Sequence, residues 1–437
     1  MSAGVHAAYA RALLEVGNPA STHGHGQRAL EALEAARERI AAGVGCDAAE
    51  LVLTGGGTES INLGLKGAYW ARQRGAERPV LLVADGEHHA TIEAAEWLRD
   101  TQGAQLVWLP LDERGTLRPE VLAAAIARAG AERVALVSFL WANNEIGTVQ
   151  PVRELCAVAS AAGVPTHVDA VAALGQIPID FAAAGADYLS VSAHKIGGPV
   201  GAGALVVGRR AAIEPLFHGG SQQRGRSGTQ DTAGAVAFAA ALDEVLEPGG
   251  NDPRPEHLAH MRALRDRLIA GVRAIDPSAV LRGAEPGAAV LDAAVSDAAV
   301  SDAVVSGVAE PFATGADAAE PFAAGADAAA LPGAGAAELP GAGARLPGNA
   351  HFTFPGCQGD SLVYLLDAAG VSVSVGSACR AGVAETSHVL LALGIPEEEA
   401  AGALRFTLGA ASSDDEVDAL LRELPSVLER ARAAGLS

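Results

Sequence analysis

The sequence predicts an α/β protein: a mostly parallel sheet covered by helices on both faces, with a smaller α+β domain after it. Its 437 residues, 49% of them hydrophobic, are enough for two domains with sizeable cores. From about Gly17 to Leu246, short apolar runs alternate with helical patterns, the rhythm of parallel strands joined by crossover helices. The predicted strands are residues 51–53, 80–83, 134–137, 167–169, 188–191 and 204–207.

Polar side chains fall at or just after the ends of these predicted strands. In sheets of this kind, ligands bind beyond the carboxyl ends of the strands. The first candidates for a functional site are therefore Thr58, His88, Asn144, Asp169 and Lys195.

Composition divides the chain into two predicted domains and one insertion. We expect a large domain over residues 17–250 and a small domain over residues 1–16 and 251–437, interrupted at about 284–344. The interrupting stretch is rich in Ala, Gly, Pro and Asp, and it repeats itself. Because it has few large apolar side chains to bury, we predict a disordered and functionally neutral insertion; the alternative is a tether for a binding partner.

Charge and hydropathy exclude several classes of partner. The formal net charge is −21, from 31 Lys and Arg against 52 Asp and Glu, which argues against nucleic acid and anionic membranes. The sequence contains no convincing apolar run of about 18 residues, and its first nine residues lack the pattern of a signal peptide. We therefore expect a cytoplasmic protein without direct contacts to membranes or nucleic acid.

The four cysteines, Cys46, Cys156, Cys357 and Cys379, are widely and irregularly spaced. This spacing indicates neither a disulfide framework nor a metal site, so we expect free thiols and no bound metal. Cys46 and Cys156 are interpreted as small buried hydrophobes. Cys379 differs, because it lies in a glycine-flanked segment of small residues, and the neighbouring Arg380 would favour its thiolate.

Lys195 follows the apolar run 188–191 in the segment Ser192-Ala193-His194-Lys195, and Asp169 ends another predicted strand. A desolvated lysine beside a charged group has a lowered pKa and can form a Schiff base with an aldehyde. A lysine for the aldehyde and an aspartate for the ring nitrogen are the two protein groups that pyridoxal phosphate (PLP) requires. The alternative is an ordinary lysine at the start of a helix.

Other segments suit the same chemistry. The glycine-rich residues 54–60 follow a strand and open a helix, an arrangement that binds phosphate; a tight turn capped by Thr58 is the alternative. His88 could stack on a ring and move protons, and the Asn144 amide could orient a ring substituent, although a satisfied polar histidine and a simple turn are the other interpretations. Arg405, inside a strand-like run, is expected to pair with a carboxylate of the protein or of a substrate.

Nine segments together resemble, in order, the motifs of cysteine desulfurases, which belong to the class V aminotransferase group of PLP enzymes. The resemblance covers nearly the whole chain except the insertion, and it implies fold type I and a homodimer. The segments are Asn18-Pro19-Ala20-Ser21, Gly57-Thr58-Glu59-Ser60, Glu87-His88, Asn143-Asn144-Glu145-Ile146-Gly147, His167-Val168-Asp169-Ala170, Ser192-Ala193-His194-Lys195, Arg226-Ser227-Gly228-Thr229, Gly376-Ser377-Ala378-Cys379 and Arg405-Phe406-Thr407-Leu408-Gly409.

The resemblance implies a role for each cofactor residue. Lys195 would hold PLP as a Schiff base, Asp169 would keep the pyridine nitrogen protonated, and His88 would stack on the ring and move protons. Asn144 would contact the ring region. The phosphate would be bound by Gly57, Thr58, Ser192 and His194, joined by Thr229 from the other subunit of the dimer.

The resemblance also implies the substrate and the product. Asn18 and Arg405 would bind the carboxylate of L-cysteine. Cys379 would take the sulfur as a persulfide and alanine would be released. The long segment from Cys379 to Ser387 resembles the group that delivers sulfur to an acceptor protein, either an iron–sulfur scaffold or a tRNA thiolation enzyme.

Three departures from the family pattern leave two alternatives open. Ala172 stands where the family usually has a glutamine, the segment 222–227 looks one residue short, and no Ala-Thr-Thr strand precedes Asn18. The alternatives are another class V enzyme, such as an aminotransferase or selenocysteine lyase, and a non-catalytic homologue that keeps the fold.

Overall fold

The computed structural model describes residues 1–220, 222–287, 344–376 and 386–435. The expected insertion lies almost entirely outside these residues, as does Cys379. Residues 1–291 and 339–437 belong to one compact unit. Within the described part of the chain, no helix is long and apolar enough to cross a membrane.

The described residues of the first half form a seven-stranded sheet in the order β1-β7-β6-β5-β4-β2-β3. Only β7 runs antiparallel to its neighbours, so the prediction of a mostly parallel sheet is confirmed. All six predicted strands form, and the half-exposed strand β3 is added at the edge. The strands are β1 (Leu51–Thr54), β2 (Val80–Ala84), β3 (Gln105–Leu109), β4 (Val134–Leu140), β5 (Thr166–Asp169), β6 (Tyr188–Ser192) and β7 (Gly203–Val207).

Both faces of this sheet are buried, because alternate strand residues enter different core clusters. In β2, Val80 and Leu82 pack with one cluster, and Leu81 and Val83 pack with another. The first cluster includes residues of α2 (Gly24–Gly43), α6 (Pro119–Ala129), α7 (Val152–Ala161), α8 (Phe181–Ala184) and α9 (Thr232–Val245). The second includes residues of α3 (Gly57–Asn62), η2 (Leu63–Gly67), α4 (Ala68–Arg72) and α5 (His89–Gln102).

Helix boundaries follow local chemistry. Helix α6 begins with Pro119 in its first turn, where a missing N–H costs no hydrogen bond. Helix α5 ends at Gly103, whose left-handed backbone (φ 70°) suits glycine. The short turns η1 (Ala48–Glu50), η3 (Ala131–Arg133) and η4 (Ala193–Ile196) complete this half of the chain.

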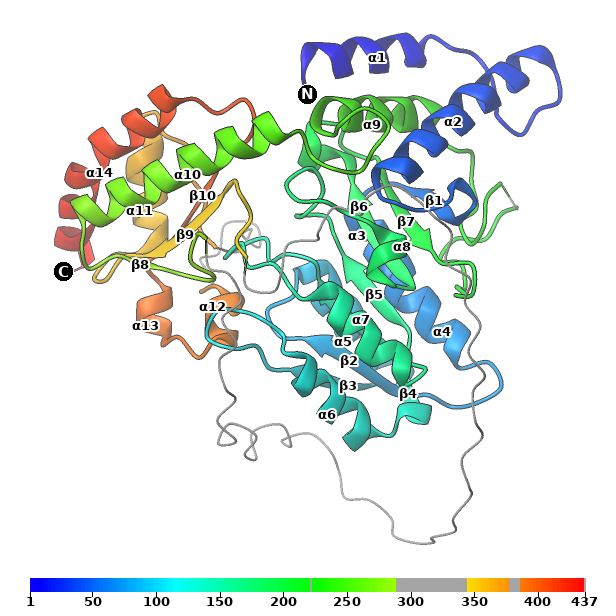
Figure 1. The fold of residues 1–437 in the computed structure, drawn as a ribbon, viewed down its shortest axis with the longest axis horizontal. Coiled ribbons are helices and arrows are strands. Elements are labelled where there is room, and N and C mark those ends of the chain that lie inside the picture. The colour runs from blue at the N-terminus through cyan, green and yellow to red at the C-terminus, as the bar shows by residue number, and fades with distance from the viewer. Residues whose placement is uncertain (221, 288–343, 377–385, 436–437) are drawn as a thin grey trace, which may run out of the picture. The chain divides into compact units, whose positions relative to one another are not determined.

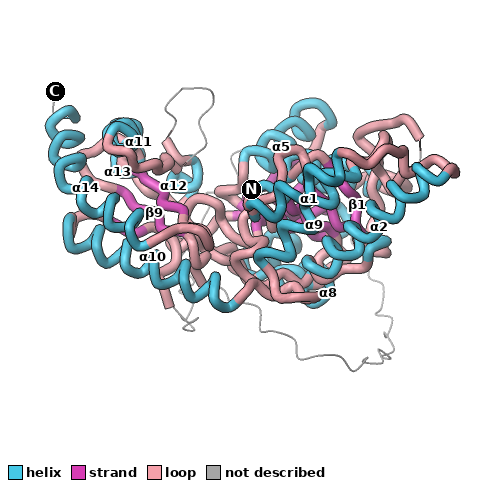
Figure 2. The backbone as a smooth tube through the Cα atoms, turned by 90° about the horizontal axis from the view of Figure 1, so that it is seen from above, coloured by secondary structure: helices cyan, strands magenta, loops and turns pink. Residues whose placement is uncertain are grey.

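The N-terminal helix α1 (Ala3–Leu13) packs along α9, as Figures 1 and 2 both show. Its Val5 belongs to the core cluster of the large sheet, and the Ser2 hydroxyl donates to Glu244 Oε1 at 2.6 Å. The expected grouping of residues 1–16 with the small domain stays a prediction, because both sheets lie in one compact unit, although α1 packs on α9 beside the large sheet.

Within the described residues, a second sheet has three antiparallel strands in the order β10-β9-β8. Its core is separate from that of the large sheet. The boundary at about residue 250 stays a prediction, since both sheets lie in one compact unit. The strands are β8 (Val280–Leu281), β9 (Asn349–Thr353) and β10 (Ala403–Thr407), and the helices are α10 (Pro255–Ile275), α11 (Gly359–Ala368), α12 (His388–Ala392), α13 (Glu397–Ala400) and α14 (Asp414–Gly435).

The two ends of the predicted insertion lie side by side. Arg345 Nε donates to the carbonyl of Ala284 at 2.6 Å, and the Val149 N–H donates to the carbonyl of Ala344 at 2.8 Å. On the other end, the Ala284 N–H donates to Thr148 Oγ1 at 3.1 Å. Ala284, Ala344 and Arg345 thus lie together beside the loop that follows β4.

Candidate active site

Asp169 and Lys195 come from the ends of neighbouring strands, β5 and β6. Asp169 is buried and its Oδ1 accepts the Val171 N–H at 2.9 Å. Burial raises the pKa of Asp169 to about 6, against the opposing effects of this hydrogen bond and of the Lys195 charge. The Lys195 side chain, in η4, is exposed to solvent, but enough protein atoms lie around its amine to desolvate it in part. Desolvation and the charge of Arg405 lower its pKa, and Asp169 opposes them.

Lys195 has few competitors for a reaction with an aldehyde, because the chain contains only two lysines. The other, Lys66, lies in η2 with its Nζ 4.4 Å from the ring centre of Trp97. No charged group is among the causes of the lowered pKa of Lys66, which is due to desolvation. Of the two amines, only Lys195 is close to a buried carboxylate.

The glycine-rich turn between β1 and α3 approaches the end of β6 closely. Gly56 has φ 132°, a conformation that favours glycine. A Cβ on Gly57 would lie 2.8 Å from Val171 Cγ2 and 3.5 Å from Ser192 Cβ. Ser192 Oγ in turn lies 2.8 Å from His194 Nδ1. The turn therefore brings backbone N–H groups beside a hydroxyl and an imidazole, donors that suit a phosphate.

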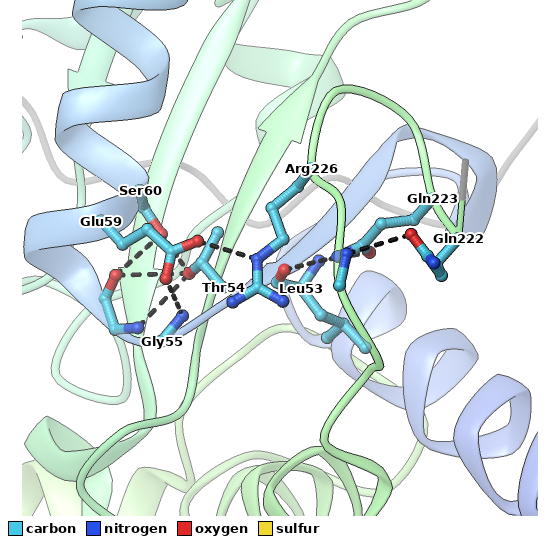
Figure 3. Close-up of polar contacts among 10 residues, drawn as sticks. Leu53, Thr54, Gly55, Glu59, Ser60, Gln222, Gln223 and Arg226 are labelled. Carbon is cyan, nitrogen blue, oxygen red and sulfur yellow. Dashed lines mark hydrogen bonds and ion pairs between the residues drawn. The ribbon is translucent and has the colours of Figure 1, made fainter. Parts of the chain in front are cut away.

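The same turn is held in place by Glu59 and Arg226, two residues that were assigned no role from the sequence. Glu59 Oε2 accepts the Gly55 N–H at 2.7 Å, and Oε1 accepts from Arg226 Nε at 2.9 Å, as Figure 3 shows. Gln223 bonds both backbone groups of Leu53, at 3.0 and 2.7 Å. Glu59 and Arg226 carry opposite charges and each lies in one of the family-like segments, so their pairing could have been suspected from the sequence.

Thr229 lies near this turn within the same chain. Together with Thr54, Gly55 and Arg226 it lines a hollow of about 90 Å³. Its expected contact with the phosphate of a second subunit stays a prediction.

His88 ends the loop that follows β2, and Asn144 lies within the loop that follows β4. His88 caps α5, with its Nδ1 accepting the Ala90 N–H at 3.1 Å. Burial, helped by the charge of Lys195, lowers the pKa of His88 to about 4. Because Nδ1 is an acceptor, the proton of the neutral imidazole is on Nε2, which can donate it. Asn144 contributes its backbone carbonyl, which accepts from Arg405 Nη1 at 3.1 Å.

Arg405 reaches this group from β10 of the small sheet. Its Nη1 also donates to the carbonyl of Gly376 at 3.5 Å, and its buried Nε has no hydrogen-bond partner among the described residues. Burial lowers the pKa of Arg405, and the charge of Glu145 opposes this. A guanidinium held by carbonyls, with donor capacity left over, suits a carboxylate ligand.

Asn18 is not brought to this group by any contact in the described structure. It is exposed, its Oδ1 accepts the Ala20 N–H at 2.9 Å, and its carbonyl accepts the Ser21 N–H at 2.8 Å. These bonds shape a local turn. Its expected contact with a substrate stays a prediction.

Two buried carboxyl groups beside the candidate residues were assigned no role from the sequence. Glu87 Oε1 accepts the Leu140 N–H at 2.7 Å, and burial and the Asp169 charge raise the pKa of Glu87 well above its usual value. Glu145 Oε2 accepts from the Ser387 hydroxyl at 2.5 Å, and burial raises the pKa of Glu145. Glu87 directly precedes His88, and Glu145 directly follows Asn144. This adjacency to candidate residues was the only sequence feature that could have pointed to them.

The three described cysteines do not resemble a reactive thiol. Burial raises the pKa of Cys46 and of Cys156 to about 12, and that of Cys357 is also raised by burial. All three pack in or against hydrophobic clusters. Among the described residues, no three His, Cys, Asp or Glu side chains form a metal-binding group.

The residues present fit PLP. At Gly57 the backbone lies so close to Val171 and Ser192 that a Cβ would not fit, which leaves the backbone open to a phosphate. Asp169 is a buried acid that could bind the ring nitrogen, and Lys195 is an exposed amine that could bind the aldehyde. The methyl group of Ala172 cannot make the polar contact that the glutamine usual at this position in the family would make. The nearby Gln176 does not replace it, because its amide contacts the carbonyl of Ala172 and the N–H of Gly348.

Comparisons with known proteins agree with this arrangement. The family model "Aminotransferase class-V" matches residues 5–302. An IscS-like cysteine desulfurase of Mycobacterium tuberculosis is 40% identical over 425 residues, covering 97% of this chain and 92% of that protein. Cysteine desulfurase IscS 1 of Archaeoglobus fulgidus is 34% identical over 418 residues, covering 95% and 91%.

The fold agrees as well. A solved NifS-like protein with 28% identity superposes with a TM-score of 0.76, covering 98% of this chain and 96% of that one. The expected PLP-enzyme fold type I is thereby confirmed. The chain belongs to the class V aminotransferase family, in its cysteine desulfurase group.

Proposed function

We propose that the protein is a PLP-dependent cysteine desulfurase that converts L-cysteine to L-alanine and leaves the sulfur as a persulfide on Cys379. The observation that carries this proposal is the meeting of Lys195, Asp169, His88 and Arg405 where the ends of β5 and β6 face β10. The names of the relatives support the choice of cysteine desulfurase over another class V activity.

The chain's own residues would divide the work as follows. When bound, PLP supplies an electron sink for negative charge developing on the substrate. Lys195 would bind it through Nζ, Asp169 would hold a proton on its ring nitrogen, and Gly57, Thr58, Ser192 and His194 would bind its phosphate. Asn144 would contact the ring region.

On the substrate side, Arg405 would bind and orient the carboxylate of L-cysteine, with Asn18 as a second group. His88 Nε2, which carries the proton of the neutral imidazole, would donate that proton and take one back, and the lowered pKa of His88 keeps the ring neutral near pH 7. The Cys379 thiolate would form a bond to the substrate sulfur as the carbon–sulfur bond breaks, and that carbon would take a proton to give alanine.

Several finer statements belong to the same proposal. We propose a cytoplasmic homodimer in which Thr229 completes the phosphate site of the other subunit. The persulfide sulfur would pass to an acceptor protein, either an iron–sulfur scaffold or a tRNA thiolation enzyme. The fixed turn that Glu59 and Arg226 hold around Gly55 supports a role for this segment in phosphate binding.

The test is a direct assay of the purified holoenzyme with L-cysteine and a thiol reductant, measuring alanine and sulfide. We expect equal amounts of both products. Cys379→Ser should keep the visible absorbance of bound PLP and its change on adding cysteine, but release no sulfide, since a hydroxyl is a far poorer nucleophile toward sulfur. Unchanged sulfide release by this variant would contradict the role of Cys379, and no product from the unmodified protein would contradict the function.

A further inference from the structure

Glu145 joins two parts of the chain that are far apart in sequence. Its side chain is almost fully buried in the loop that follows β4, and its Oε2 accepts the Ser387 hydroxyl at 2.5 Å. Ser387 is also buried, and the same hydroxyl oxygen accepts the Leu390 N–H at 3.2 Å, capping α12. A hydroxyl that donates to a buried carboxylate while capping a helix has its position fixed twice.

Gly376 meets the same carboxylate. A Cβ at this position would lie 2.6 Å from Glu145 Oε2 and 3.0 Å from Ser387 Cβ, so only glycine fits without a shift. Gly376 and Ser387 stand on either side of residues 377–385, the stretch of sequence that includes Cys379. The two positions that flank this stretch therefore touch each other at Glu145.

Both positions are also tied to the loops that carry candidate residues. The carbonyl of Gly376 and that of Asn144 both accept from Arg405 Nη1. The residue after Ser387, His388, lies with its Nε2 2.7 Å from the carbonyl of Glu87, and its ring centre is 4.6 Å from that of His89. The residues on either side of the Cys379 stretch are thus held close to Arg405, to Asn144 and to the two neighbours of His88.

We propose that Glu145 is a positioning residue for sulfur transfer. Resting on the function proposed above, it fixes Gly376 and Ser387, which stand on either side of Cys379 in the sequence, relative to Arg405 and His88. Its contacts are with Ser387 and Gly376, so losing either contact should slow sulfur transfer more than it weakens cysteine binding.

Two variants test the two contacts separately. Ser387→Ala removes the hydroxyl that bonds Glu145, and Gly376→Ala places a methyl group against Glu145 Oε2. For each, kcat for sulfide release is measured at saturating cysteine. The Kd for cysteine is measured from the visible spectrum in a Cys379→Ser background. We expect Ser387→Ala to lower kcat about tenfold or more, the worth of one lost hydrogen bond to a charged group, and Gly376→Ala to lower it by a similar factor through its clash with Glu145. We expect Kd to stay within about twofold for both.

The chain offers a matched control for each variant. The Ser2 hydroxyl also caps a helix, accepting the Val5 N–H at 3.1 Å, and also donates to a glutamate, Glu244, at 2.6 Å, but on the surface of α1. Ser2→Ala should leave kcat unchanged. Gly250→Ala is the control for the added methyl group, because no atom lies closer than 3.9 Å to a Cβ at that position.

Rescue and stability measurements separate positioning from folding. Ser387→Thr keeps the hydroxyl and should restore kcat to near that of the unmodified enzyme. Gly376→Ala keeps the Ser387 hydroxyl that caps α12, so it tests the proposal even if Ser387→Ala lowers the Tm. If both variants kept kcat within twofold, or if Kd rose in step with the loss of kcat, the positioning role would be wrong. Absence of sulfide release from the unmodified protein would instead contradict the proposed function.

Discussion

The lysine side and the arginine side of the candidate site are built in different ways. Asp169 ends β5 and Lys195 follows β6, and these are adjacent parallel strands of one sheet in register from His167 with Tyr188 onward. Arg405 belongs to β10 of the other sheet and reaches the site only by packing, with its guanidinium held by two backbone carbonyls. The lysine side is thus fixed by strand order, and the arginine side depends on contacts between the two sheets.

The two sides also differ in how fully their polar groups are satisfied. The Asp169 carboxylate accepts a backbone N–H and is near the Lys195 charge, whereas Arg405 Nε has no partner among the described residues. A buried donor left without an acceptor costs free energy unless a ligand supplies one. This difference suggests that the lysine side is preformed and that the arginine side is completed by substrate. Five predictions test this comparison.

The largest effect is expected for Lys195→Ala. This variant should lose the visible absorbance of bound PLP and all measurable turnover, because no second lysine lies near Asp169. Lys66→Ala is the control and should keep both. Borohydride reduction of the unmodified holoenzyme followed by peptide mapping should find the cofactor on Lys195 alone. A labelled Lys66 or a coloured Lys195→Ala protein would contradict the assignment.

Arg405→Gln should affect the other side of the site. Losing one or two charge-assisted hydrogen bonds to the substrate carboxylate should raise the KM for cysteine roughly 10- to 100-fold, while the absorbance of bound PLP stays unchanged. Steady-state kinetics and spectra check this, with the exposed Arg422→Gln on α14 as a control. Loss of PLP together with the change in KM would mean that the two sides are not independent.

Two buried histidines, one in each sheet, should respond oppositely to replacement at pH 7. His167 lies 2.9 Å from both Ser138 Oγ and Ser190 Oγ, whereas neither ring nitrogen of His351 has a partner among the described residues. His167→Leu should lower the free energy of unfolding by about 1–3 kcal/mol, and His351→Leu should leave it unchanged or raise it. Chemical denaturation at pH 7 measures both, and destabilisation by His351→Leu would show that its ring is bonded after all.

The same pair predicts a pH dependence. Burial lowers the pKa of His351 to about 3, helped by the charges of Arg345, Arg405 and Arg282, and burial alone lowers that of His167 to about 3. The unfolded chain therefore binds more protons than the folded one below about pH 6.5, and stability falls as the pH drops from there toward 3. His351→Leu should reduce the loss of stability between pH 7 and pH 5 by about 2 kcal/mol. An unchanged loss would mean that His351 is not buried in its neutral form.

The smallest effect is expected from removing the insertion. Replacing residues 288–343 by a short Gly-Ser linker keeps Glu285, which pairs with Arg273 at 2.7 Å, and Ala344, which accepts from Val149. Because the two ends already lie side by side, and each doubling of loop length costs only about 0.6 kcal/mol, we expect the Tm to change by a few kelvin at most and kcat to be kept. An insoluble or much less stable product would show that the segment is packed.

The sequence alone determined the sheet and the cofactor side of the site. Runs of four to seven buried apolar residues can form little other than central strands, and residues just after parallel strands must gather at one edge. Asp169, Lys195, His88 and the turn at Gly57 could therefore be named from order and residue type. The packing of α1 on α9 could not, because an isolated amphipathic helix does not reveal which surface covers it.

Only the tertiary structure decided the substrate side. That Arg405 donates to Asn144, and that Glu145 bonds Ser387 across 242 positions of sequence, depends on how one sheet packs against loops of the other. Periodicity describes the neighbours within an element but carries no information on such long-range pairs. The roles of Glu59, Glu87 and Glu145 became visible for the same reason: a glutamate in a sequence reads as exposed until the fold shows which backbone groups and side chains bury it.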